Sequence, residues 1–234
     1  MREEKIASFY QTHDVILPPD FSYRIFLLRK EKFWFRVWQF KDMAILKEKL
    51  IEQKPISAYV SVAVYLYPDE VESKYTKHSK ISDLMIRNDL VIDLDNQDIF
   101  NLRRAYNFLK KIFNEFMFVK TPHGFHIWVL DFYEKNKEEI VRSNNFEMKI
   151  LEKKRKICRW LLSKKVDLDY AVSIDTRRFV RVWNSLDAKS RKICYANSDF
   201  SEFLNEFKTK SQYNAYPLKL RSDMQKCINE REWM

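Results

Sequence analysis

The sequence predicts an α/β (α+β) protein with mixed β-sheets flanked by helices, and three observations lead to this prediction. Short runs of β-branched and aromatic residues alternate along the chain with segments whose apolar residues recur at helical spacing. The 234 residues are enough to bury a sizeable core. No Gly/Ser-rich linker, low-complexity tract or internal repeat divides them. We therefore expect a single domain over residues 1–234.

The N-terminal part is predicted to contain a helix, a hairpin, a second helix and a strand. Ile6, Phe9 and Tyr10 recur at helical spacing, and Pro18-Pro19-Asp20 marks a break after them. Two aromatic segments around a charged turn are typical of a β-hairpin. The expected elements are a helix near 6–10, strands at 23–28 and 33–40 around a turn at 29–32, a helix at 45–52 and a strand at 58–67.

The rest of the chain continues this alternation. Residues 90–95 are apolar and then acidic, which is typical of a strand that runs out into a site. Pro122-His123-Gly124 lies between two apolar runs and predicts a strand–turn–strand. The other expected elements are an amphipathic helix at 102–116, strands at 116–119 and 125–130, a helix at 150–162, strand-like segments at 172–174 and 179–183, and a helix at 200–207.

Charge and cysteine usage narrow the class of protein. Lys+Arg number 43 against 33 Asp+Glu, a net charge of +10, so a polyanionic partner is the first expectation. The cysteines Cys158, Cys194 and Cys227 form no Cys-x-x-Cys pair, which disfavours a disulfide framework, a zinc site and an iron–sulfur cluster. With no apolar leader and no apolar run long enough for a bilayer, we expect a cytoplasmic protein without a membrane partner.

Asp93 and Asp95 are the first candidate site residues. Alternate residues of a strand project from the same face, so both carboxylates would point one way while Ile92 and Leu94 point into the core. Two acids about 7 Å apart repel each other unless a cation lies between them. Mg²⁺ binds through a few carboxylates and substrate phosphates. A second Asp-x-Asp, at 167–169, follows two lysines and is interpreted as a loop.

The second candidate group surrounds the single glycine of the chain, Gly124, where a protein of this length usually has about 16. A glycine retained in such a sequence predicts a place where no side chain is tolerated. Two of the four histidines, His123 and His126, flank it. A histidine at the head of a strand can contact a phosphate or a reacting group, although a lone histidine often has a structural role instead.

The third candidate group begins at Asp175 and continues with Arg177, Arg178, Arg181 and Lys189. A metal–triphosphate site needs this combination, because the acid completes the metal shell and the cations offset the charge of the phosphates and of the leaving pyrophosphate. The alternative is a charged edge strand. Such a strand should carry its charges on one face, whereas these fall on both.

Taken in order, these blocks resemble the small, catalytic subunit of archaeal and eukaryotic DNA primase, in the archaeo-eukaryotic primase superfamily. The resemblance covers about residues 6–190, and Arg24 and Arg36 match arginines of the family's paired strands. Residues 90–95 look like its acidic-pair motif, and Gly124-Phe125-His126 looks like its Gly-x-His motif. Residues 175–186 align without a gap to its Asp-x-x-Arg-Leu-Ile-Arg-x-Pro-x-Ser-Leu run.

The resemblance implies a primase catalytic-core fold without the family's zinc knuckle, followed by a helical C-terminal segment at 191–234. It implies Mg²⁺ or Mn²⁺ as the cofactor, with no zinc or iron–sulfur cluster in this chain. Departures from the family pattern are Lys120 and His123 in place of a serine and an arginine, Ile25 in place of a glutamate, and Asp187 in place of a histidine. The implied metal ligands are Asp93, Asp95 and Asp175, and the implied nucleotide or phosphate contacts are His126, Arg178, Arg181, Lys189, Arg36 and His123.

The function implied by the resemblance is template-directed synthesis of short primers on single-stranded DNA from nucleoside triphosphates during DNA replication. It also implies a heterodimer with a large primase subunit that carries the iron–sulfur cluster. The expected location is the cytoplasm of an archaeon, at the nucleoid.

Two other functions stay open at the level of sequence. Residues 91–95 also resemble the nucleophile strand of haloacid-dehalogenase-type phosphatases, although Asn96-Gln97 stands where that family has a Gly-Thr-like pair. Covalent trapping of Asp93 as an aspartyl-phosphate would favour this alternative. The other possibility is a non-catalytic, nucleic-acid-binding subunit of a replication complex, and an incorporation assay separates it from an enzyme.

Overall fold

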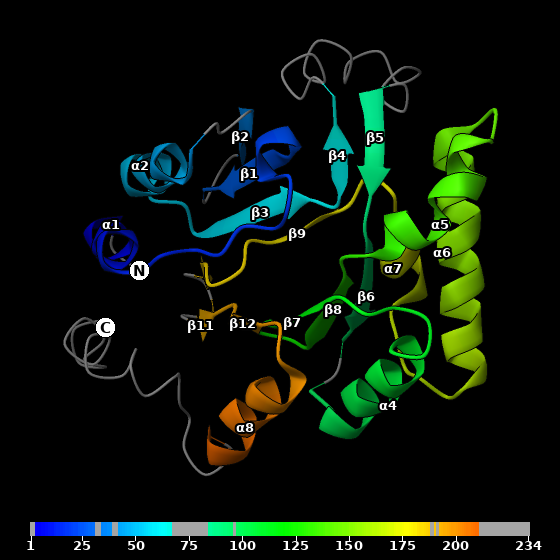
Figure 1. The fold of residues 1–234 in the computed structure, drawn as a ribbon. Helices are drawn as coiled ribbons and strands as arrows, with labels where there is room; N and C mark the ends of the chain where they lie inside the picture. Colours follow the sequence, from blue (N-terminus) through cyan, green and yellow to red (C-terminus); the bar gives the residue numbers. More distant parts are fainter. Residues whose placement is uncertain are drawn as a thin grey trace.

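The computed structural model describes residues 3–30, 34–38, 42–66, 84–95, 97–187, 190 and 192–210, without the side chains of 34–38 and 207–210. The protein is a mixed α/β structure, and its described strands form two four-stranded and two two-stranded antiparallel sheets (Figure 1). None of the helices in these ranges is long and apolar enough to cross a bilayer.

The first sheet contains the predicted hairpin. In spatial order it consists of β2 (Trp34–Trp38), β1 (Ile25–Arg29), β3 (Ser57–Ser61) and β9 (Phe179–Arg181). The turn predicted at 29–32 lies partly outside the described residues. Two predicted helices are confirmed and pack against the sheet through buried apolar side chains; they are α1 (Glu3–Thr12) and α2 (Met43–Gln53).

The second sheet contains the acidic strand. In spatial order it consists of β12 (Ala196–Asn197), β7 (Phe116–Lys120), β8 (Phe125–Val129) and β6 (Leu90–Leu94). Four helices share one apolar core with it: α4 (Ile99–Leu109), α5 (Phe132–Val141), α6 (Phe146–Ser163) and α8 (Phe200–Lys210). The strands at β7 and β8 and the helices at α4, α6 and α8 were predicted, although α4 ends earlier than expected, and α5 was not.

Both faces of the second sheet are buried, and β6 shows how. Leu90, Ile92 and Leu94 point into the core formed with the helices, whereas Val91 belongs to a second core shared with the first sheet. Because side chains alternate along a strand, Asp93 lies on the face that looks toward the first sheet. The prediction that Ile92 and Leu94 point into the core, opposite Asp93, is therefore confirmed.

The strand predicted at 58–67 is split between two sheets. β3 ends at Ser61, and after Val62 the chain continues as β4 (Ala63–Tyr65), which pairs with β5 (Met85–Asn88). β5 runs on into β6 after Asp89, whose backbone N–H donates to the carbonyl of Val62 at 3.1 Å. The two continuous segments therefore cross at Val62 and Asp89, where the sheets meet.

Two sequence predictions about local structure are wrong. The segment 172–174 was predicted as a strand but belongs to the short helix α7 (Tyr170–Ile174), because the Asp169 carboxylate caps the helix by accepting from the N–H of Val172. The segment after 190 was predicted as helical but begins with strands. These are β11 (Lys192–Ile193), which pairs with β10 (Leu186–Asp187), and β12. Residues 211–234 lie outside the described part.

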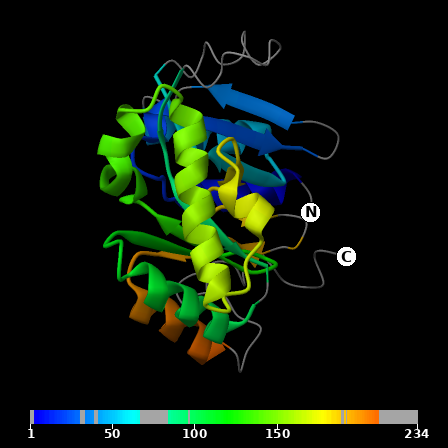
Figure 2. The same cartoon turned by 90° about the vertical axis from the view of Figure 1, so that its right-hand side faces the viewer.

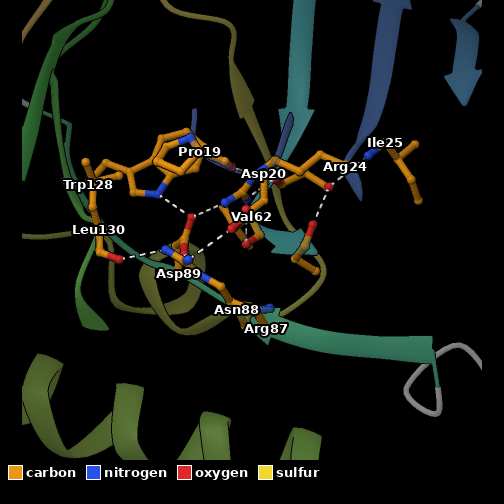
Figure 3. Close-up of polar contacts among 12 residues, drawn as sticks. Pro19, Asp20, Arg24, Ile25, Val62, Arg87, Asn88, Asp89, Trp128 and Leu130 are labelled. Carbon is orange, nitrogen blue, oxygen red and sulfur yellow. Dashed lines mark hydrogen bonds and ion pairs between the residues drawn. The ribbon is translucent and has the colours of Figure 1, made fainter. Parts of the chain in front are cut away.

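A buried polar network joins the two sheets at their crossing (Figure 3). The guanidinium of Arg24, with no exposed surface, donates to the Asp89 carboxylate and to the carbonyls of Pro19, Ser61 and Val62. The same carboxylate accepts from Trp128 Nε1 at 2.8 Å and from Arg87 Nε at 3.1 Å. Asp89 is thus a buried charge with three donors, and Arg24, which resembles a family arginine, has a structural role here.

Candidate active site

Asp93 and His126 are direct cross-strand neighbours on β6 and β8. Both side chains are buried, on the face that looks toward the first sheet, and His126 Nε2 lies 3.4 Å from Asp93 Oδ1. The pKa of His126 is well below its usual range, because the ring is buried and because Arg178 and Arg181 disfavour a further positive charge. His126 is therefore a neutral imidazole that can donate or accept one hydrogen bond.

The two arginines lie at the two ends of β9, Arg178 just before it and Arg181 as its last residue, far from Asp93 in the chain. Arg178 Nη2 forms an ion pair with Asp93 Oδ2, while the other terminal nitrogen of Arg178 is buried without a hydrogen-bond partner among the described residues. A buried N–H that lacks an acceptor costs free energy, and an anion that binds there removes that cost. The site thus has a donor that is ready for a phosphate or carboxylate oxygen.

Asp187 stands where the primase pattern has a histidine, and its carboxylate holds Arg181. The Nη1 of Arg181 lies 3.2 Å from Asp187 Oδ1 outside hydrogen-bond geometry, and the guanidinium lies 4.5 Å from the ring centre of Tyr59. Ser57 and Ser190 donate to the Asp187 carboxylate at 2.9 and 2.6 Å. Burial acts to raise the pKa of Asp187, but the hydrogen bond from Ser190, the charge of Arg181 and the hydrogen bond from Ser57 lower it overall. Asp187 is therefore ionised and positions Arg181.

Asp95 follows the end of β6 and is exposed. Its pKa is raised first by partial desolvation of the carboxylate and then by the negative charges of Asp93, Asp169 and Asp167. Arg178 acts in the opposite direction. The smaller contributions of Asp93, Asp169 and Asp167 mean that these carboxylates repel one another, which is the condition that a divalent cation relieves. The chemistry of the donor set therefore fits a hard cation bound by oxygen.

Sequence reasoning missed the role of residues 169–173, although the second Asp-x-Asp was a visible signal. The Asp169 N–H donates to the carbonyl of Asp93 at 2.9 Å, and the Asp93 N–H donates to Ser173 Oγ at 3.0 Å. Helix α7 and its N-cap residue thus satisfy both backbone groups of Asp93 on the side of β6 away from β8. These bonds hold Asp93 in place independently of its side chain.

Asp175 ends α7 and is exposed. Its carboxylate accepts from the N–H of Arg177 at 2.9 Å, and its carbonyl lies 3.4 Å from Lys154 Nζ. It is absent from the charges that shift the pKa of Asp95. As the side chains stand, no three Asp, Glu, His or Cys residues of the described ranges lie close enough together to hold a metal ion.

Of the remaining candidates, the structure describes the side chain of His123 alone. His123 lies in the turn between β7 and β8 with an exposed side chain. Arg36 lies in β2, opposite Leu27, and its side chain is outside the described part. Lys189 is also outside it.

Gly124 confirms the prediction that no side chain is tolerated at its position. A Cβ built there would lie 1.9 Å from the carbonyl oxygen of Leu94 and 2.9 Å from the carbonyl carbon of Asp95. The backbone φ of Gly124 is not positive, so the requirement is space and not a left-handed conformation. The glycine allows the β7–β8 turn to pack against the backbone that carries Asp95.

Lys154 is buried, with its Nζ near the carbonyl of Asp175. Replacing Lys154 should change how the free energy of unfolding depends on pH. Burial lowers the pKa of Lys154 to about 7, whereas the unfolded chain holds the proton to a pKa of about 10.4. Between these values the unfolded state binds more protons, so the free energy of unfolding rises with pH. The increase from this lysine should be on the order of 2 kcal/mol between pH 7 and pH 9.

In the Lys154→Met variant this contribution should be absent. Urea unfolding of both proteins at a series of pH values checks it, since other groups titrate alike and cancel in the difference. Parallel plots of the free energy of unfolding against pH for the two proteins would contradict a lowered pKa of Lys154.

The site combines a buried ion pair, a neutral histidine, unsatisfied guanidinium donors and a group of repelling carboxylates. Its parts come from the end of β6, from β8, from α7 and from the segment 178–181 that contains β9. The arginines offer hydrogen-bond donors to an anion, and the acids gather negative charge beside them. In the comparisons with known proteins, neither the protein-family models nor the curated proteins gave a match to this chain.

Proposed function

We propose that this chain is the small, catalytic subunit of a DNA primase, with the primase catalytic-core fold, and that it transfers nucleotides to growing primers on a single-stranded DNA template. The observation that carries the proposal is the convergence of Asp93, His126, Arg178 and Arg181. Three sequence blocks that resemble primase motifs supply these residues, and the blocks are far apart in the chain. A resemblance by chance would not require the blocks to meet in space.

The arginines are suited to hold the triphosphate. Two groups would donate to phosphate oxygens. One is Nη1 of Arg178, which has no hydrogen-bond partner among the described residues, and the other is the guanidinium of Arg181, positioned by Asp187. Neutral His126 would add a hydrogen bond from its ring without adding charge. Catalysis of this kind depends on positioning and on electrostatic stabilisation of the leaving pyrophosphate, and not on a covalent enzyme intermediate.

Asp93, Asp95 and Asp175 would hold Mg²⁺ or Mn²⁺. The carboxylates of Asp93 and Asp95 already repel each other, and Asp175 is assigned by the resemblance. When bound, such an ion stabilises charge on the phosphates and lowers the pKa of the attacking hydroxyl. Asp169 adds negative charge to the same group. Its carboxylate also caps α7, so it would favour the cation mainly through its field.

Primer synthesis by the whole chain tests this function. The assay uses a single-stranded DNA template with ribo- or deoxyribonucleoside triphosphates, with and without a large primase subunit. We expect template-dependent products and pyrophosphate release that require Mg²⁺ or Mn²⁺. Phosphate release without template would favour the phosphatase alternative, and nucleic-acid binding without products under any condition would favour the non-catalytic subunit.

Arg181→Gln should raise the apparent KM for nucleotides by about tenfold or more, because a charged hydrogen bond to phosphate contributes about 1.5–3 kcal/mol. Steady-state incorporation at saturating template measures the effect. Arg142→Gln removes the same charge from an exposed arginine of the α5 end and should leave KM unchanged. An unaltered KM in Arg181→Gln would remove the residue from phosphate binding.

A further inference from the structure

One face of α6 carries a row of charged side chains that the proposed active site does not use. Lys149, Glu152, Arg155, Lys156 and Arg159 each lie three or four residues from another member of the set, so they form a single stripe along the helix. The opposite face, with Lys154 and Cys158 among its members, is buried. Figure 2 shows α6 along the side of the molecule turned to the viewer, beside α7.

The stripe has an excess of positive charge. Lys149 and Glu152 form an ion pair at 2.9 Å and compensate each other. Lys156 lowers the pKa of Glu139, whose direct partner is Lys153, but forms no ion pair of its own with a described residue. Arg155 and Arg159 are exposed, and within the described ranges neither forms an ion pair. Three cations therefore face solvent without a bound carboxylate.

These side chains also line a groove of about 520 Å³. From Lys149 to Arg159 the helix rises about 15 Å, so several phosphates of an extended strand could lie along it. Met148 is the one large apolar residue of the lining. A docking site for a protein usually has an apolar centre with aromatic residues, which this lining lacks. A phosphate backbone is instead bound by cations. The lining residues belong to α6 and the turn before it, so the groove follows one helix face and could hold an extended single strand along its length.

We propose that this face of α6 binds the sugar–phosphate backbone of single-stranded nucleic acid, without regard to base sequence. The lining has no aromatic side chain on which bases could stack, so recognition is through charge. Binding here requires neither nucleotide nor divalent cation. The inference therefore goes beyond the proposed activity and can succeed or fail separately from it.

The test compares two variants that each lower the formal net charge from +10 to +6, since two charge reversals remove four charges. One is Arg155→Glu/Arg159→Glu. The other is Lys110→Glu/Lys111→Glu, at the exposed end of α4. Fluorescence anisotropy with a labelled oligothymidylate is measured in EDTA over a salt series, with thermal melting to verify the fold.

The α6 variant should bind about tenfold or more weakly, and the slope of log K against log salt should become shallower by about 1.4, the value for two lost phosphate contacts on a single strand. The α4 variant should keep nearly the original slope. Equal losses in both double variants would overturn the proposal, because net charge alone would explain them. A loss confined to duplex DNA, or to an added protein subunit, would also overturn it.

Discussion

Asp93→Asn should lower the rate of nucleotide incorporation by on the order of a thousandfold while the chain stays folded. Asparagine keeps the shape of the side chain but removes the charge that faces Arg178 and that would bind the cation. The backbone bonds of Asp93 to Ser173 and Asp169 do not involve the side chain and should persist. The fold should therefore persist, with some loss of stability from the unpaired Arg178 guanidinium, and the main effect should appear in the rate.

Primer extension under saturating nucleotide measures this effect, with circular dichroism and thermal melting as checks on folding. Asp42→Asn is the matched control. Asp42 is exposed and caps α2 by accepting from the N–H of Ala44, and asparagine caps helices equally well. The control should retain full activity. If Asp93→Asn polymerised at the original rate, Asp93 would have no role in the reaction and the proposed function would lose its central residue.

Arg24→Met should lower the free energy of unfolding by about 3–5 kcal/mol, the usual cost of removing one partner from a buried ion pair. Methionine fills a similar volume but cannot donate to the carbonyls of Pro19, Ser61 and Val62, of which Val62 keeps the N–H of Asp89. The buried Asp89 carboxylate would keep only Trp128 and Arg87 as partners. The junction of the two sheets should therefore weaken, and with it the placement of β6 and β9 that brings the site together.

Urea denaturation measures this loss, and Lys47→Met serves as its control. Lys47 pairs with Asp14 at the surface, where the two side chains are 35% and 77% exposed. An exposed pair contributes at most about 1 kcal/mol, so this variant should be close to the original in stability. A cost for Arg24→Met as small as that of the control would mean that the network in Figure 3 does not hold the sheets together.

Local patterns were sufficient for most of the elements. The spacing of Ile6, Phe9 and Tyr10 predicted α1, and short apolar runs predicted the strands that carry Asp93 and His126. The reason is that such patterns record which side of an element is buried. The same logic failed for residues 172–174, whose β-branched side chains favoured a strand. A capping carboxylate and the need to cover the edge of β6 decided for a helix.

Partners across the chain could not be predicted. Asp187 was visible only as a departure from a family pattern, and its pairing with Arg181 depends on where β9 and β10 lie. Asp169 was set aside as a loop residue, yet its backbone binds that of Asp93. Spacing along the chain carries no information about which side chains of different elements come into contact. Such contacts depend on how the sheets pack.

By itself, the sequence determined the class of fold, the excess of positive charge, the acidic end of one strand and a position that admits only glycine. Each of these follows from local chemistry, because burial pattern, charge and side-chain volume are properties of short segments. The tertiary structure alone decided that Arg178 faces Asp93, that His126 is neutral, and that Arg24 joins the two sheets. Those outcomes depend on burial and on distances between remote residues, and both arise only when the sheets pack against each other.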